Sequence, residues 1–258
     1  STMPLAAVSP VEHDSILRLA PRAPRLPVDA GGRVTGAGPG LNAIQHVNNE
    51  TGVIQPLDEL AREIHAAGGL LLADCAQSAG KLPLPPADLI AISAHKFGGP
   101  IGVGALLVRE WSMLAPTGGQ EQGYRPGTEN LPGALAMAAA LEAGNAWLDE
   151  ARRLRASLET RIEAAGGAVI GRSLPRLATI GAIRMPGKAA AVQLIRFDAM
   201  GIAVSAGSAC SSGSLKPSHV LAAMQTPHAS EVIRVSIGRE TTQGDIDRFV
   251  VAWQEVQG

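Results

Sequence analysis

Three short apolar runs, spaced along the chain between residues 69 and 110, constrain the fold most strongly. They read GLLLAD at 69–74, DLIAIS at 88–93 and GVGALLVRE at 102–110. Each run is short enough for a strand and lacks the polar alternation of a strand with one wet face. Continuous apolar strands are typical of a parallel or mixed sheet that is covered on both faces.

Helical patterns lie between the predicted strands. Residues 4–8 and 41–47 add two more strand candidates. Asp14 is in position to cap a short helix over 15–20, and residues 57–67 have helical spacing that ends at two glycines. Alternating strands and helices predict an α/β fold with a mixed, mostly parallel sheet flanked by helices.

The second half of the chain has a different pattern. From Leu131 to about residue 167 the sequence favours one long helix, or two helices with a break near Gly144 and Asn145. Strand and helix candidates then alternate up to a final helix from Thr242. We therefore expect a large domain over residues 1–148 and a smaller α+β domain over residues 149–258.

Composition excludes several classes of function. The chain of 258 residues has a formal net charge of -1, no polybasic block and only 3% aromatic residues, which argues against nucleic acid as a partner. Cys75 and Cys210 match no zinc spacing. The first ten residues lack the basic and apolar regions of a signal peptide, and no apolar run is long enough to span a bilayer. We expect a cytoplasmic protein with free thiols, with no metal and no membrane contact.

Lys96 is the first candidate for chemistry. It follows an apolar strand, between Ser93 and His95 on one side and Gly98 and Gly99 on the other. An arbitrary lysine in such a loop is usually only solvated. However, α/β sheets bind ligands at the carboxyl ends of their strands, and the glycines leave room for a bound group. Lys96 could therefore form a Schiff base with a carbonyl compound.

Asp74 ends the apolar strand before that lysine. Its carboxylate could simply cap the following turn. An acid at this place also suits the pyridinium nitrogen of pyridoxal phosphate, because its negative charge keeps that nitrogen protonated. The neighbouring Cys75 is expected to be a small buried residue.

Three further segments leave alternatives open. Asn48, Asn49 and Glu50 favour a local turn. Cys210 lies in SAGSACSSGSLKPS, which cannot pack a core, so its thiol is expected to be exposed and either incidental or reactive. Arg234 lies among apolar strand residues and requires a carboxylate, from an internal ion pair or from a substrate.

Seven segments, taken in order, resemble the cysteine desulfurases of the NifS/IscS type, within the class V aminotransferase family. They are VEHDSIL, HVNNETGVIQP, DCAQSAGK, SAHKFGGPIGVGAL, GGQEQGYRPGTEN, AGSACSSGSLKPS and IRVSIGRETT. One such segment is a weak signal, but seven in register from about Val11 onward are a strong one.

The resemblance implies a homodimeric fold-type-I enzyme that binds pyridoxal phosphate. Its family roles can be carried over to matching positions of this chain. Lys96 would bind the cofactor covalently, Asp74 would pair with the ring nitrogen, Gln77 would donate to the ring hydroxyl, His13 would stack on the ring and assist proton transfer, Ser93 and His95 would contact the phosphate together with Thr128 of the partner subunit, and Asn49 and Arg234 would hold the substrate carboxylate.

The resemblance also implies a reaction. L-Cysteine would be converted to L-alanine, and its sulfur would be transferred to Cys210 as a persulfide. A sulfur-acceptor protein, such as a scaffold for iron–sulfur cluster assembly or a thiolation enzyme, would then collect this sulfur. An exposed Ser/Gly loop suits a cysteine that must travel to its acceptor.

The chain departs from the family pattern at two places. By the resemblance, the sequence starts just before the histidine expected to stack on the ring, on the order of a hundred residues later than the family pattern, and the turn that usually cradles the phosphate is expected to be missing. Residues 32–40 stand where the family usually has a helix. The alternatives are therefore an N-terminally shortened desulfurase, a degenerate non-catalytic homologue that acts as an interaction protein, and a related enzyme such as a selenocysteine lyase or a transaminase.

Overall fold

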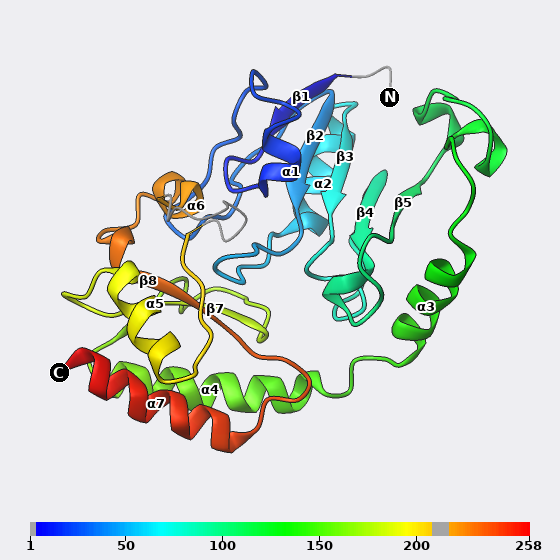
Figure 1. Cartoon of the computed structure of the whole chain (residues 1–258). Helices are drawn as coiled ribbons and strands as arrows, with labels where there is room; N and C mark the ends of the chain where they lie inside the picture. Colours follow the sequence, from blue (N-terminus) through cyan, green and yellow to red (C-terminus); the bar gives the residue numbers. More distant parts are fainter. Residues whose placement is uncertain (1–3, 208–216) are drawn as a thin grey trace. The chain divides into compact units, whose positions relative to one another are not determined.

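The computed structural model describes residues 4–207 and 217–258 (Figure 1). The chain forms two compact units. Unit 1 comprises the residues up to Pro27, Val34–Val47 and Gln55–Asn145. Unit 2 comprises Val28–Arg33, Asn48–Ile54 and Ala146–Gly258.

Unit 1 is built on a mixed five-stranded sheet, as the apolar runs predict. Its strands follow the chain order across the sheet. The first four strands are parallel to one another, and the fifth is antiparallel to the fourth. The strands are β1 (Leu5–Val8), β2 (Leu41–Gln45), β3 (Leu70–Asp74), β4 (Leu89–Ser93) and β5 (Gly104–Val108).

Helix α2 (Leu57–Ala66) accounts for part of the core of unit 1. It buries one face, formed by Leu57, Leu60 and Ile64. On the sheet, Ile44 of β2 and Leu71 of β3 are fully buried. These apolar side chains explain why the parallel strands are continuous apolar runs in the sequence.

Helix α1 (Asp14–Leu17) begins one residue earlier than predicted. His13, and not Asp14, is its N-cap, and the ring Nδ1 of His13 accepts a hydrogen bond from the backbone N–H of Ser15 at 3.1 Å. Asp14 instead lies in the first turn, where its negative charge favours the positive end of the helix dipole.

The last part of unit 1 differs from the prediction of a sheet covered on both faces. Strand β5 is the edge strand of the sheet, and Leu106 is 49% exposed. Helix α3 (Leu131–Glu142) is apolar, yet only Gly133 is buried in it. Because β5 is antiparallel to β4, no helical crossover joins the two strands. Helix α3 contacts the rest of the unit through Met137 and Ala140, which pack against the small buried cluster of Ala79, Ala94 and Phe97. Three single 3-10 turns complete unit 1: η1 (Ala94–Lys96), η2 (Trp111–Met113) and η3 (Glu121–Gly123).

Unit 2 contains an antiparallel three-stranded sheet in the order β6-β7-β8. Helices α4 and α7 run side by side (Figure 1). In the core of the unit, Phe197 of α5 stacks on Phe249 of α7, with 5.1 Å between the ring centroids. The elements are α4 (Leu148–Ala164), β6 (Ala168–Val169), β7 (Ile180–Arg184), α5 (Ala190–Ala199), α6 (His219–Ala223), η4 (Ala229–Glu231), β8 (Val232–Ser236) and α7 (Gln243–Gln257). The predicted long helix is thus two helices, α3 and α4, with the break at the expected residues.

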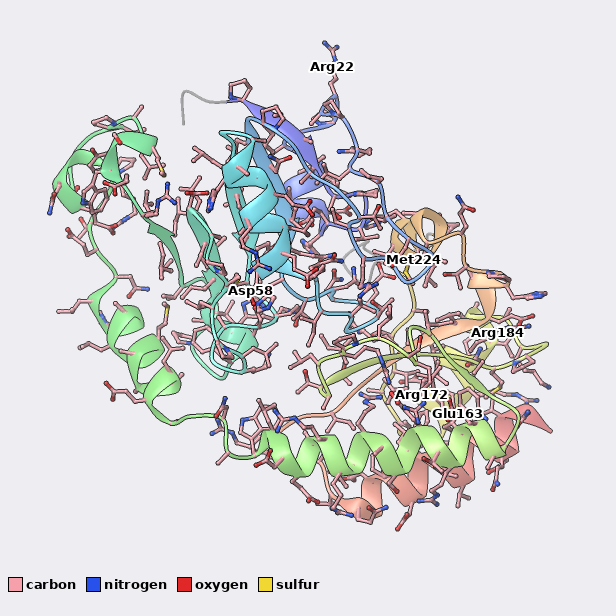
Figure 2. All side chains as sticks on the ribbon, turned by 180° about the vertical axis from the view of Figure 1, so that it is seen from behind. Arg22, Asp58, Glu163, Arg172, Arg184 and Met224 are labelled. Atoms are coloured by element: carbon pink, nitrogen blue, oxygen red, sulfur yellow. The ribbon has the colours of Figure 1, made fainter. Side chains whose placement is uncertain are left out.

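A group of arginines and glutamates ties α4 to the segment before β7. Arg176 makes two hydrogen bonds of 2.7 Å to the carboxylate of Glu159, and both side chains are nearly inaccessible. Figure 2 shows Arg172 beside Glu163 in the same part of the unit. The Nε of Arg172 lies 3.0 Å from Oε1 of Glu163. Burial lowers the pKa of Arg155 to about 10, and this side chain donates to two backbone carbonyls. These contacts are those of a structural anchor.

Two short segments from the first half of the chain belong to unit 2. In the second of them, the carbonyl of Gly52 accepts a hydrogen bond from Leu177, and Ile54 donates to Pro175. Gly52 has a φ of +76°, and a Cβ there would lie 2.6 Å from the carbonyl oxygen of Ile180, so only glycine fits. The division into domains 1–148 and 149–258 stays a prediction. Within the described part of the chain, no helix combines the length and apolar character needed to cross a membrane.

Candidate active site

Polar residues collect at the carboxyl ends of the parallel strands of unit 1. In the sheet register, Gln45 of β2 lies opposite Asp74 of β3, and Asp74 lies opposite Ala91 of β4. The segments that follow β1, β3 and β4 therefore leave the sheet at the same edge. In α/β proteins this edge is where ligands bind.

Asp74 is the half-buried carboxylate at this edge. Its Oδ1 accepts a hydrogen bond from the backbone N–H of Ala76 at 2.9 Å, so it does cap the following turn. Burial raises the pKa of Asp74, while this hydrogen bond and the charge of His13 act in the opposite direction. Among the described residues, no donor lies within hydrogen-bond distance of Oδ2. One oxygen thus remains for a ligand.

Lys96 closes the 3-10 turn that follows β4. Phe97, which follows the turn, is buried. Gly99 lies so close to Ala94 that a Cβ on Gly99 would be only 2.8 Å from the Cβ of Ala94. Ser93 Oγ and His95 Nδ1 are 2.9 Å apart. His95 and Lys96 are exposed, so this short turn presents an amine, a hydroxyl and an imidazole to solvent.

His13 lies at the end of the segment that follows β1. Because Nδ1 accepts from the Ser15 backbone, the hydrogen of the neutral ring is on Nε2. The preceding Glu12 is fully buried, and its Oε1 accepts a hydrogen bond of 2.6 Å from the backbone N–H of Gln45. Burial raises the pKa of Glu12 well above 4.5, and the charge of Asp74 adds to this effect. Sequence reasoning missed Glu12, although its position beside His13 after a strand was a signal.

The turn after β3 carries Gln77, whose side chain is half-buried. The backbone carbonyl of Gln77 accepts a hydrogen bond of 2.9 Å from the amine of Lys81. In the same turn, Ser78 Oγ lies 2.9 Å from Nδ1 of His46, which follows β2, and burial lowers the pKa of His46. Neither His46 nor Lys81 was recognised from the sequence, because both lie beside stronger motifs.

Cys75 is buried, as predicted. Burial raises the pKa of its thiol to about 12. The nucleophilic form of a cysteine is the thiolate, so Cys75 is not reactive near neutral pH.

The remaining predicted residues belong to other segments of the chain. Thr128 is exposed in the loop between η3 and α3 of unit 1. In unit 2, Arg234 donates one hydrogen bond to the backbone carbonyl of Asn49 at 3.0 Å and another to Ser205 Oγ at 3.2 Å. Within the described ranges, no carboxylate lies at ion-pair distance from Arg234, and its buried Nε lacks a hydrogen-bond partner. Cys210 lies outside the described residues.

The groups at this edge of unit 1 fit pyridoxal phosphate. The ring nitrogen of this cofactor requires an acid, its aldehyde requires a lysine, and its phosphate requires hydrogen-bond donors. Asp74 supplies a half-buried carboxylate oxygen without a donor. Lys96 supplies the amine from the neighbouring strand end, and the pair Ser93 and His95 supplies donors.

Comparison with known proteins identifies the group to which the molecule is related. The chain belongs to the class V aminotransferase family, whose pattern it matches over residues 34–249. Within this family it is similar to cysteine desulfurases. It is 40% identical to that of Gluconacetobacter diazotrophicus over 244 residues, and this match covers 88% of the chain and 60% of the relative.

A second relative and two solved structures agree with this result. The cysteine desulfurase of Rhodobacter capsulatus is 38% identical over an aligned length of 282 positions, gaps included, and the match covers 96% of this chain and 72% of the relative. A NifS-like protein superimposes with a TM-score of 0.84 at 28% identity, covering 97% of this chain and 74% of that one. The structure of SspA in complex with cysteine has a TM-score of 0.77 at 26% identity, with 94% and 76% covered. The expected fold-type-I architecture is confirmed, and the chain spans 60% of the length of the first relative.

Proposed function

We propose that this chain acts as a pyridoxal-phosphate-dependent cysteine desulfurase, which converts L-cysteine to L-alanine and transfers the sulfur to Cys210. One observation carries the proposal: Asp74 and Lys96 lie at the carboxyl ends of adjacent parallel strands, β3 and β4. The similarity to relatives named cysteine desulfurase supports it.

The residues at the strand ends would hold the cofactor by complementary chemistry. When bound, the cofactor supplies an electron sink that weakens the bonds at the substrate Cα. A protonated ring nitrogen beside Asp74 would offset the cost of burying its carboxylate, and it would favour the ionised form. The proposed contacts are Lys96 to the aldehyde carbon, Asp74 to the ring nitrogen, Gln77 to the ring hydroxyl, His13 to the ring face, and Ser93, His95 and Thr128 to the phosphate.

Arg234 would bind the substrate carboxylate. Two of its nitrogens are engaged by Asn49 and Ser205, which fix the direction of the guanidinium, and its Nε retains a donor. A planar guanidinium with a donor to spare is well suited to a carboxylate. The neighbour SspA was solved in complex with cysteine, which is consistent with an amino-acid substrate here. Asn49, whose carbonyl orients Arg234, would complete this binding group.

Lys96 and Cys210 would carry out the chemistry. The amine of Lys96 would take the proton from the substrate Cα. The thiolate of Cys210 would attack the substrate sulfur, so that a sulfur–sulfur bond forms as the carbon–sulfur bond of cysteine breaks. L-Cysteine and the Cys210 thiol thus become L-alanine and a persulfide, without an external oxidant. The buried Cys75 does not compete for this sulfur, because the pKa of its thiol is raised to about 12.

The proposal includes partners. The enzyme would act as a homodimer in which Thr128 of the partner subunit contacts the phosphate. The persulfide would pass to a sulfur acceptor, such as an iron–sulfur scaffold or a thiolation enzyme. A cytoplasmic location belongs to the same proposal, because Cys210 must remain reduced between turnovers.

The cofactor site can be tested by covalent trapping. The purified protein is mixed with pyridoxal phosphate and reduced with borohydride, and the modified lysine is identified by mass spectrometry. We expect a visible absorption band and one adduct, on Lys96, which is lost in Lys96→Ala and kept in the control Lys188→Ala. Adducts spread over several lysines would contradict the proposed site.

A further inference from the structure

Glu50 is a buried carboxylate in the turn formed by residues 48–51 of unit 2, and it is only 5% exposed. Asn48 closes this turn, because its Oδ1 accepts hydrogen bonds from the backbone N–H groups of Glu50 at 2.9 Å and Thr51 at 2.8 Å. Among the residues that the structure describes, no basic side chain lies at ion-pair distance from Glu50, and its Oε1 accepts no hydrogen bond. Burying a carboxylate without a cation is costly, so the contact of its other oxygen has to offset this cost.

The other oxygen of Glu50 holds the start of α6. Its Oε2 accepts a hydrogen bond of 2.6 Å from Oγ of Ser218, a distance typical of a hydroxyl that donates to an ionised carboxylate. Ser218 is the N-cap of α6, and its Oγ accepts a hydrogen bond of 3.0 Å from the backbone N–H of Leu221. Because the single hydrogen of this hydroxyl is directed at Glu50, a lone pair is free to face Leu221. Glu50 therefore fixes the chain at the point where α6 begins.

Asn49, the residue before Glu50, holds a second segment of unit 2. Its backbone carbonyl accepts a hydrogen bond of 3.0 Å from Nη1 of Arg234, whose Nη2 donates to Oγ of Ser205 at 3.2 Å. The two backbones also pair: the N–H of Arg234 donates to Ser205 at 2.6 Å, and that of Ser205 donates back at 3.1 Å. Since Arg234 lies on the edge strand β8, Ser205 is attached to the sheet of unit 2 and to the turn 48–51 at once.

Ser205 and Ser218 lie on either side of Cys210 in the sequence. The turn 48–51 thus holds the described chain both before and after the residue proposed to receive the sulfur. A thiol on a tether meets its target at a rate that depends on where the two ends of the tether are fixed, because these ends set its effective concentration. Releasing one end should therefore slow a transfer to this thiol.

We infer that Glu50 and Ser218 are positioning residues for the transfer of sulfur to Cys210. The inference rests on the proposed function, in which the Cys210 thiolate attacks the substrate sulfur. The hydrogen bond between the two residues fixes one end of the segment that carries Cys210, and it does so from the same turn whose backbone orients Arg234, the residue proposed to bind the substrate carboxylate. This bond takes no part in the removal of the substrate Cα proton.

The anchoring can be measured without cofactor, by amide hydrogen exchange. Glu50→Ala should speed the exchange of the Leu221 amide about tenfold, because its acceptor Ser218 loses its fixed orientation. The Ser205 amide, which is held by another residue, should exchange as before. Glu50→Gln keeps an oxygen that can accept from Ser218, and Glu255→Ala removes an exposed glutamate of α7, so both should leave the exchange of Leu221 close to that of the unaltered protein. Unchanged exchange of Leu221 in Glu50→Ala overturns the inference.

The effect on the reaction is then measured in two separate steps. With pyridoxal phosphate and L-alanine in deuterated water, exchange of the Cα hydrogen reports proton removal and needs no thiol. With L-cysteine, the mass of the Cys210 peptide reports sulfur transfer in a single turnover. Glu50→Ala should slow the sulfur transfer about tenfold and leave the Cα exchange unchanged, while Glu50→Gln should retain most of the transfer. Equal losses in both steps overturn the inference, because they would indicate a purely structural residue.

A change on the other side of the hydrogen bond covers the case in which Glu50→Ala does not fold. Ser218→Gly removes the hydroxyl but leaves a residue that is still favourable as an N-cap, and it should show the same split between the two steps. Ser218→Thr keeps the hydroxyl and should transfer sulfur like the unaltered protein. Normal transfer in Ser218→Gly overturns the inference. The absence of Cα exchange in the unaltered protein would instead refute the proposed function, and this inference with it.

Discussion

The first four strands of unit 1 and the segment 98–145 that follows them both contain apolar elements, but these elements have different surroundings. In the first region, Leu71 and Ile44 are fully buried, and α2 covers part of the sheet. In the second, β5 exposes both of its faces and α3 exposes nearly all of its apolar residues (Figure 1). The difference teaches that apolar composition predicts which element forms, while burial depends on which neighbours are present.

The candidate site residues also differ in how firmly the structure holds their backbones. Asp74 and Lys96 follow strands that are hydrogen-bonded on both sides, so their backbones are fixed by the sheet. Thr128 lies in the exposed segment and has no such support. Sites that are held on rigid elements keep their geometry better than sites on loops.

The largest expected effect comes from deleting matched leucines in the two regions. Leu71→Ala in β3 should lower the free energy of unfolding by about 2–5 kcal/mol, because it leaves a cavity in a close-packed core. Leu106→Ala in β5 should lower it by no more than about 1 kcal/mol, because half of this side chain already faces solvent. Urea denaturation measures both. Equal losses would mean that β5 is buried in solution, and the contrast between the two regions would be wrong.

A smaller effect should appear in the pH dependence of stability. Because burial raises the pKa of Glu12, the folded state binds this proton more tightly than the unfolded state. The stability that this tighter proton binding contributes is fully present below pH 4.5, the ordinary pKa of a glutamate side chain. It is lost as the pH rises through the raised pKa of Glu12 in the folded protein. Burial in the first region thus carries a cost that the exposed segment does not have.

The variant Glu12→Gln isolates this cost. Its amide oxygen can still accept the hydrogen bond from Gln45, but it cannot titrate. Urea denaturation between pH 4.5 and 8 should show a flatter fall in stability than in the unaltered protein. Glu129→Gln, in the exposed segment, serves as the control and should leave the slope unchanged. Parallel curves for Glu12→Gln and the unaltered protein would show that Glu12 does not titrate in this range.

Much of the framework could be predicted from the sequence because the signals were local. The continuous apolar runs identified the strands, and the residues that end them, Asp74 and Lys96, were found by their position alone. The break between α3 and α4 was one of two alternatives that the glycine and asparagine left open.

Other features could not be predicted because they depend on contacts between distant residues. The exposure of Leu106 follows from β5 being an edge strand, which no local pattern reveals. The burial of Glu12 depends on a hydrogen bond from Gln45, 33 residues away in the sequence. Residues 48–54 belong to unit 2 and make hydrogen bonds to residues 175 and 177, more than a hundred positions away in the sequence.

The location of the transferred sulfur tests the central claim most directly. The protein, loaded with pyridoxal phosphate, is given L-cysteine, and alanine is measured together with the mass of the peptides that contain Cys75 and Cys210. We expect alanine and one added sulfur atom on Cys210, both lost in Lys96→Ala, while Cys75→Ala behaves like the unaltered protein. No alanine, or sulfur on Cys75 in place of Cys210, would contradict the account.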